Sequence, residues 1–176
     1  MSSIRVAILT VSDRSARNER PDLSGPALQQ LAQELGWQTV HSAIVPDVLE
    51  DIQRVMIAWC DLQGDVDLVL TSGGTGFAPR DITPEATLAV IDRNAPGLAE
   101  AMRQESLKIT PHAMLSRLAA GIRGQTLIVN LPGRPKAIKE NLDAVFPAIP
   151  YCIELIGGPA LEVTDASPGA YRPPQS

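Results

Sequence analysis

A glycine-rich loop followed by an acidic side chain is the part of this sequence best suited to chemistry. Residues 71–76 read TSGGTG, follow the apolar run 68–70 and precede Asp81. Glycine adopts backbone conformations that are closed to residues with a Cβ, so several N–H groups of such a loop can converge on one phosphate. A short glycine motif is also typical of a tight turn that needs its glycines for shape alone. Asp81 favours the phosphate site, because a carboxylate beside phosphates implies a cation between them.

A helix is predicted to begin directly after Asp81. Thr83 suits the N-cap and Pro84 suits the first helical position. The free N–H groups and the dipole of a helix N-terminus also favour negative charge. The loop and the helix would therefore offer two features that attract anions.

Two further carboxylates follow strand-like segments. Asp13 comes after the apolar run 6–11, and Asp47 comes after residues 38–45. Asp47 also has a purely structural interpretation, because Asp47 and Glu50 fit a capping box at the start of the next helix.

The alternation of strand and helix patterns predicts an α/β fold with a mainly parallel sheet between helix layers. Residues 14–23 are polar and predict a loop. Strands are predicted at residues 6–11, 38–45, 68–70 and 126–130, the last in a hairpin with 122–124. Helices are predicted behind Ser24, behind Asp47, at residues 86–91 and 98–107, at 112–120 behind a Thr110 cap, and at 138–156, where Pro147 and Pro150 should divide the helix.

Four loops should meet at one edge of this sheet, because the carboxyl ends of parallel strands lie at the same edge. Ligands of such sheets bind beyond that edge. The loops are residues 12–13, 46–47, 72–76 and 130–133. Three carboxylates would then surround two glycine loops, with few cations nearby. The carboxylates are Asp13, Asp47 and Asp81, and the cations are Arg80, Arg117 and Arg134. Magnesium suits this arrangement, since it is commonly held by one or two carboxylates plus substrate phosphates.

Composition bounds the class of protein. A chain of 176 residues with 44% hydrophobic residues suits one compact domain. The net charge of −5 leaves no basic stripe for nucleic acid, so a phosphate site must be local. The loop after the first strand lacks the GxGxxG of a dinucleotide fold, which argues against a dehydrogenase. We expect one domain over residues 1–157 and a flexible tail over residues 158–176.

Cysteine usage and apolar patterning indicate where the protein works. Cys60 and Cys152 lie far apart without CxxC spacing, and we expect both to be buried, reduced thiols. No apolar stretch approaches the length of a membrane span, and the N-terminus runs directly into a strand pattern rather than a signal peptide. These features predict a cytoplasmic protein that does not associate with membranes.

Several ordered motifs together resemble the Mog-type molybdopterin adenylyltransferases, the family that includes the gephyrin G domain. The resemblance covers roughly residues 4 to 157. The motifs are TVSD at 10–13, VPD at 45–47, TSGGTGFAPRDITPEAT at 71–87, APG at 95–97, TPHAMLSR at 110–117, GIRG at 121–124 and NLPG at 130–133. One small departure is Ser72, where other members often have threonine.

The resemblance implies a three-layer α/β/α domain with Rossmann-like topology that assembles as a homotrimer. It implies transfer of AMP from Mg-ATP to the terminal phosphate of molybdopterin, with release of pyrophosphate. Asp47 and Asp81 match the two essential carboxylates of the family and would be the catalytic, magnesium-binding residues. The residues matched to substrate and nucleotide binding are Thr10, Ser12, Asp13, Ser72, Gly73, Gly74, Thr75, Gly76, Arg80, Ser106, Ser116, Arg117, Asn130, Pro132 and Gly133. Among these, Ser106, Ser116 and Arg117 match the pterin side.

The resemblance also implies partners. The chain lacks a second domain for molybdenum insertion, so a separate protein is expected to receive the product. A non-catalytic module of the same fold, which binds molybdopterin or nucleotide or serves as a scaffold, remains the alternative.

Overall fold

The sheet at the centre of the molecule has six strands in the order β2-β1-β3-β6-β5-β4. The structure is a computed structural model, and it describes residues 3–62, 64–160, 170, 171 and 173. The strands are β1 (Arg5–Val11), β2 (Gln38–Val45), β3 (Leu68–Ser72), β4 (Arg93–Asn94), β5 (Ala120–Arg123) and β6 (Thr126–Leu131). Strands β2, β1, β3 and β6 pair in parallel, whereas β5 and β4 add an antiparallel edge. The expected mainly parallel sheet is confirmed.

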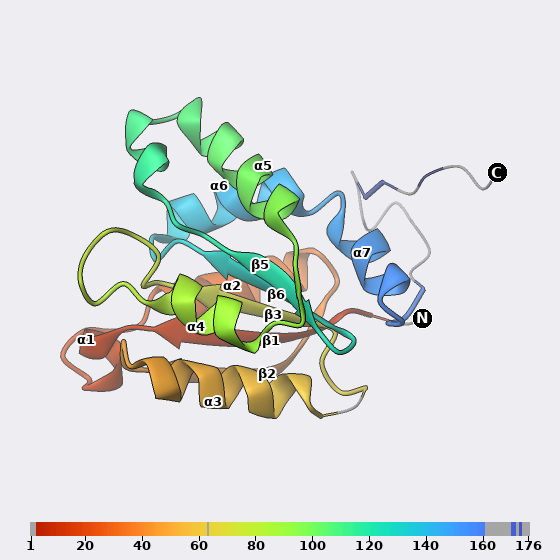
Figure 1. Cartoon of the computed structure of the whole chain (residues 1–176), viewed down its shortest axis with the longest axis horizontal. Helices are drawn as coiled ribbons and strands as arrows, with labels where there is room; N and C mark the ends of the chain where they lie inside the picture. The colour runs from red at the N-terminus through yellow and green to blue at the C-terminus, as the bar shows by residue number, and fades with distance from the viewer. Residues whose placement is uncertain (1–2, 63, 161–169, 172, 174–176) are drawn as a thin grey trace.

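Helices cover both faces of this sheet (Figure 1). They are α1 (Asp13–Ala16), α2 (Ser24–Glu34), α3 (Leu49–Cys60), α4 (Thr83–Val90), α5 (Pro96–Leu107), the 3-10 helix η1 (Pro111–Leu115), α6 (Pro135–Val145) and α7 (Ile149–Leu155). Side chains of α2, α5, α6 and α7 pack in one core cluster, and those of α3 and α4 pack in another. The three-layer α/β/α architecture is therefore confirmed.

The alternation of side chains along buried strands divides the core in two. In β1, Val6 and Ile8 belong to the cluster under α2 and α6, while Ala7 and Leu9 belong to the cluster under α3 and α4. Successive strand residues point to opposite faces, so a strand that is covered on both sides is apolar throughout. This explains why the strand segments read as continuous apolar runs.

Several local predictions hold and others are wrong. The hairpin of β5 with β6 is confirmed, as is the division of the last helix into α6 and α7. The segment 14–23 was expected to be a loop, but its first residues belong to the short helix α1. Strand β4 was not predicted, because two exposed residues carry no apolar pattern. Within the predicted tail 158–176, residues 161–169, 172 and 174–176 lie outside the described part of the chain.

The helix predicted at residues 112–120 is wrong. Thr110 does cap a helix, since its hydroxyl accepts a hydrogen bond from the N–H of His112 at 3.3 Å, but the helix is η1 and ends at Leu115. The N–H of Arg117 then bonds to the carbonyl of Thr75, and Ala120 begins β5. Pairing with the rest of the fold overrides local helix preference here.

No helix among the described residues has the length and the apolar character to cross a membrane.

Candidate active site at the carboxyl edge of the sheet

The four predicted loops do meet at one edge of the sheet. Parallel pairing of β2, β1, β3 and β6 places their carboxyl ends side by side. The N–H of Ser12 donates to the carbonyl of Val45 at 2.9 Å, and the N–H of Gly73 donates to the carbonyl of Leu131 at 3.2 Å. The first bond joins the loop 12–13 to the last residue of β2, and the second joins the loop 72–76 to the loop 130–133. The expected gathering of loops is therefore confirmed.

The glycine loop requires its glycines for close approach. Gly73 has a φ of 98°, and a Cβ there would lie 2.3 Å from the carbonyl oxygen of Val11. Gly74 has a φ of 62°, and a Cβ there would lie 2.4 Å from Oγ1 of Thr83 and 3.1 Å from Oδ1 of Asp47. Both positions therefore exclude other residues through backbone conformation and through space.

Thr83 fastens this loop instead of capping α4. Its hydroxyl donates to the carbonyl of Gly73 at 2.9 Å, and its N–H donates to the carbonyl of Gly74 at 3.0 Å. The N-cap of α4 is Ile82, without a side-chain cap, so the predicted Thr83 cap is wrong. The bonds to the loop fix the glycine backbone directly before a helix N-terminus.

Asp47 also differs from its structural interpretation. The N-cap of α3 is Val48 and no side chain caps the helix, so the capping box is wrong. Instead, Oδ2 of Asp47 accepts a hydrogen bond from the N–H of Asp13 at 2.8 Å, while Oδ1 of Asp13 accepts from the N–H of Asp47 at 3.0 Å. This reciprocal pair turns the Asp47 carboxylate toward the glycine loop.

The charges of the site act on one another. Burial raises the pKa of the Asp47 carboxyl, and the charges of Asp13 and Asp81 raise it further. The hydrogen bond from the N–H of Asp13 and the positive charge of Arg80 lower this pKa. Hydrogen bonds from Arg80 hold the pKa of Asp13 below its usual range. The reciprocal bonds of Asp13 and Asp47, together with the position of Asp47 beside Gly74 and of Asp81 beside Gly76, place the three carboxylates on the same side of the molecule.

Asp81 lies on the other flank of the glycine loop. Its Oδ2 accepts a hydrogen bond from the N–H of Ala78 at 3.0 Å, and a Cβ on Gly76 would lie 2.9 Å from the same oxygen. Asp47 beside Gly74 and Asp81 beside Gly76 thus border one short loop from two sides.

Arg117 holds this flank together. Its Nε donates to the carbonyl of Gly76 at 2.7 Å, and its Nη groups donate to the carbonyl of Asp81 and the carboxylate of Glu85. The predicted substrate contact by Arg117 is therefore accompanied by a structural role, since its guanidinium is engaged with the protein.

The donor set fits magnesium with substrate ligands. Among the described residues, no hydrogen bond is formed by Oδ1 of Asp47 or Oδ1 of Asp81, so each carboxylate has an oxygen available. The described part of the chain has no cluster of three or more His, Cys, Asp or Glu side chains that could hold a metal by itself. Two carboxylates completed by phosphate oxygens and water match the preference of Mg²⁺.

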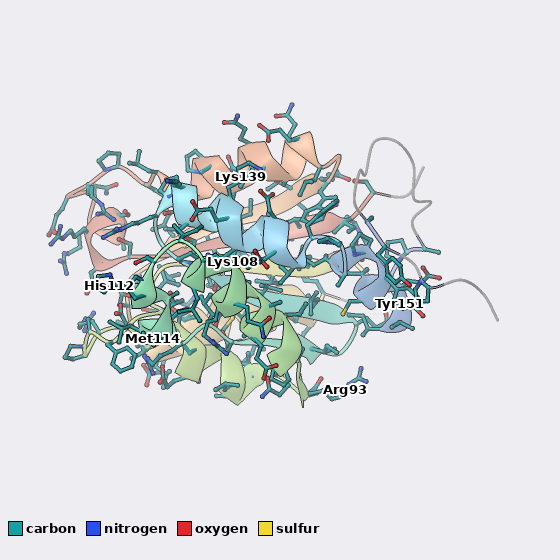
Figure 2. All side chains as sticks on the ribbon, turned by 90° about the horizontal axis from the view of Figure 1, so that it is seen from above. Arg93, Lys108, His112, Met114, Lys139 and Tyr151 are labelled. Atoms are coloured by element: carbon teal, nitrogen blue, oxygen red, sulfur yellow. The ribbon has the colours of Figure 1, made fainter. Side chains whose placement is uncertain are left out.

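A cavity of about 370 Å³ opens beside the same loop. It extends from the glycine loop to α5, η1 and α6, and its lining includes His112, which Figure 2 labels. Six predicted site residues line it: Thr75, Gly76, Ser106, Ser116, Pro132 and Gly133. The sheet edge and these helices together bring residues that are far apart in the sequence to one surface.

Several other predicted site residues also form hydrogen bonds within the protein through their side chains. The hydroxyl of Thr10 donates to Asp22 at 2.8 Å, and that of Ser72 donates to the carbonyl of Pro132 at 3.0 Å. Asn130 is fully buried, and its amide nitrogen donates to Thr71 and Thr87 at 2.9 and 2.8 Å. These side chains support the loops that form the site. Ser12 accepts from the N–H of Ser15 at 3.3 Å as the cap of α1.

The site residues expected from the sequence leave out five polar residues that line the cavity. Thr110 was expected only as a helix cap and Arg134 only as a nearby cation, and His112, Glu140 and Asn141 were not expected there. Asn141 is 4% exposed, and its Oδ1 accepts a hydrogen bond of 3.4 Å from Ser106. Arg134 precedes the first turn of α6, and Glu140 lies on the helix. The sequence does show that the apolar positions of this helix, Ile138, Leu142 and Val145, leave a polar stripe, but it does not show what that stripe faces.

A larger cavity of about 690 Å³ lies at the opposite edge of the sheet. Its lining includes Arg5 at the start of β1 and Thr126 at the start of β6, and none of the predicted site residues. Size alone therefore does not mark the site, because six predicted site residues line the smaller cavity and none lines the larger one.

This chain is similar in sequence and in structure to proteins associated with molybdopterin. The family described as "probable molybdopterin binding domain" matches residues 7–151. A molybdopterin adenylyltransferase of Helicobacter pylori (strain J99) is 48% identical to this chain over 99% of this chain and 100% of its own length. Gephyrin of Dictyostelium discoideum is 49% identical over 86% of this chain, which spans 22% of gephyrin. The crystal structure of the molybdopterin biosynthesis enzyme MoaB from Thermus thermophilus is 48% identical, with a TM-score of 0.81 over 87% of this chain and 96% of that chain.

Proposed function

The chain belongs to the family of probable molybdopterin-binding domains, and from this premise we propose that it is a molybdopterin adenylyltransferase acting in molybdenum cofactor biosynthesis. The observation that carries the proposal is that Asp47 and Asp81 flank one glycine loop beside a cavity of about 370 Å³. Two anionic substrates can meet at this loop from its two sides.

The reaction joins two phosphates. An oxygen of the terminal phosphate of molybdopterin forms a bond to the α-phosphorus of ATP. The bond between that phosphorus and the oxygen bridging to the β-phosphate breaks, and pyrophosphate leaves with the electron pair. The protein does not need a nucleophile of its own, so it must align the phosphates and neutralise their charge.

The two sides of the loop suit the two substrates. The cavity between η1, α5 and α6 takes the pterin, with polar groups of Ser106, Ser116 and Asn141 in its lining. The corner formed by Asp13, Asp47 and Arg80 takes the phosphates of ATP. Backbone N–H groups of residues 73–76 lie between these places and would bind the reacting phosphates.

Asp47 and Asp81 would hold Mg²⁺, each with one carboxylate oxygen. When bound, the ion supplies positive charge that reduces repulsion between the phosphates. Thr83 keeps the glycine loop in place, and the reciprocal bonds to Asp13 orient Asp47. These contacts keep the glycine loop and the Asp47 carboxylate in position during the transfer.

The proposal extends to the surroundings of the enzyme. We place it in the cytoplasm as a homotrimer that passes adenylyl-molybdopterin to a separate molybdenum-insertion protein. Light scattering on the purified protein would measure the trimer, and a monomeric mass would contradict it.

The decisive experiment measures pyrophosphate release from Mg-ATP with and without molybdopterin. Release that depends on molybdopterin is expected. The variant Asp61→Asn should match the wild type, because Asp61 is paired with Arg123 beside the cavity at the opposite edge of the sheet. Binding of both substrates without release would instead identify a non-catalytic binding module of the same fold.

A further inference from the structure

Arg80 and Asp13 form an exposed ion pair at the corner where the loops after β1, β2 and β3 meet. Nε of Arg80 donates to Oδ2 of Asp13 at 2.9 Å, and Nη2 donates to Oδ1 at 2.7 Å. The side chain of Arg80 is 60% exposed and that of Asp13 is 22% exposed. Within the described part of the chain, Asp13 is the sole hydrogen-bond partner of the Arg80 guanidinium.

The other arginine of this site is held differently. Arg117 is bound to the carbonyls of Gly76 and Asp81 and to the carboxylate of Glu85, so turning to a ligand would break several bonds that shape the loop. Arg80 would give up only one exposed ion pair, and such pairs contribute little to stability. Arg80 is therefore the arginine that can exchange partners.

Asp13 connects this cation to the carboxylate of Asp47. Its N–H donates to Oδ2 of Asp47 at 2.8 Å, while its Oδ1 accepts from the N–H of Asp47 as well as from Arg80. Both oxygens of Asp13 are thus occupied by protein donors. A carboxylate with both oxygens occupied is suited to positioning Asp47 and Arg80, and it is poorly suited to binding an anionic substrate.

We propose that Asp13 is a positioning residue, which orients Asp47 and holds Arg80 ready to transfer to the phosphates of ATP. The inference rests on the proposed function. A polyphosphate carries more charge than one carboxylate and accepts the paired N–H groups of a guanidinium in the same bidentate way. Arriving nucleotide therefore competes with Asp13 for Arg80, and Asp13 keeps its bonds to Asp47 after the exchange.

The exchange predicts opposite effects for the two partners of one ion pair. The test is titration calorimetry of ATP and of inorganic pyrophosphate at fixed Mg²⁺, without molybdopterin. Arg80→Ala should lower the affinity for ATP and for pyrophosphate by about tenfold or more, because a charge-assisted contact is lost. Asp13→Asn should raise the affinity for both ligands by about two- to fivefold. The charge that competes for Arg80 is gone, while an acceptor for the N–H of Asp47 remains. Turnover should fall in both variants.

A purely structural ion pair predicts a different result. If the pair only fastened the loops, Arg80→Ala and Asp13→Asn would weaken binding together, and that outcome overturns the inference. An unchanged affinity in either variant also overturns it. Arg80→Lys keeps the charge without the bidentate geometry and should lie between Arg80→Ala and the wild type.

Two controls separate this inference from the proposed function. Arg54→Ala breaks an exposed ion pair of the same kind on α3 and should bind ATP as the wild type does. A wild-type protein that binds neither ATP nor pyrophosphate would remove the proposed function and this inference with it. A wild type that turns over, together with an Arg80→Ala variant of normal affinity, would remove only the inference.

Discussion

Oδ1 of Asp47 lies 3.1 Å from the position that a Cβ would occupy on Gly74. The carboxylate thus lies against the backbone of the loop, in space that a side chain at position 74 would need. Proximity of this kind makes the loop and the carboxylate one unit, and substitutions in either should affect the other.

Gly74→Ala tests this unit. The left-handed φ should cost about 1–2 kcal/mol, and the added methyl would contact Thr83 and Asp47, so both stability and turnover should fall. Denaturant unfolding and pyrophosphate release measure the two effects. Gly97→Ala is the matched control, because a Cβ there meets nothing within 4 Å; equal behaviour of the two variants would contradict the requirement for glycine.

Asp47→Asn and Asp81→Asn should separate catalysis from folding. Each substitution keeps an acceptor for the backbone bond but removes a charge, and turnover should fall by about 100-fold or more. Burial disfavours the charged form of Asp47 by raising its pKa, so its neutralisation at pH 7 should not lower the melting temperature. Near-normal turnover in either variant would exclude that residue from the mechanism.

Asn130→Ala should destabilise the protein. The fully buried amide bonds Thr71 and Thr87, and its oxygen accepts from the N–H of Ala119 at 3.3 Å, so removal leaves buried groups unpaired at a cost of about 3 kcal/mol. Chemical denaturation measures this free energy. The exposed Asn94→Ala should change it by less than about 0.5 kcal/mol, and comparable losses in both would argue against the buried network.

Ala137→Phe should fill the cavity proposed for the pterin. The KM for molybdopterin should rise by about tenfold or more, while the affinity for ATP stays unchanged, because the nucleotide corner lies on the other side of the loop. Ala144→Phe, placed two turns along α6 and outside this cavity, is the matched control. A parallel loss of ATP affinity in Ala137→Phe would place the two substrates differently.

Cys60 should resist alkylation in the folded protein. Burial raises the pKa of its thiol to about 12, so at pH 8 the thiol is protonated and poorly nucleophilic. Mass spectrometry after iodoacetamide treatment should find Cys60 unmodified until urea is added. Cys152, predicted to be buried, is partly exposed and should react earlier; modification of Cys60 first would contradict this order.

The sheet and its functional edge could be predicted because their signals are local. Apolar runs such as residues 6–11 and 68–70 must be covered on both faces, and parallel strands must place the following loops together. The identities of Asp13, Asp47, Asp81 and the glycines then indicated where a site for phosphate and magnesium is expected. The cavity wall from α6 was missed, because nothing in its sequence states which helix face meets the NLPG loop.

The sequence by itself determined which residue types reach the edge of the sheet, since strand pattern and loop composition depend on neighbours along the chain. Only the tertiary structure decided what those residues do there. Asp47 fits a helix cap in sequence but bonds to Asp13 from another loop, and Asn130 reads as a site residue but is enclosed by Thr71 and Thr87. A polar side chain takes whichever partner the packed fold brings within hydrogen-bond distance, and those partners lie tens of residues away in sequence.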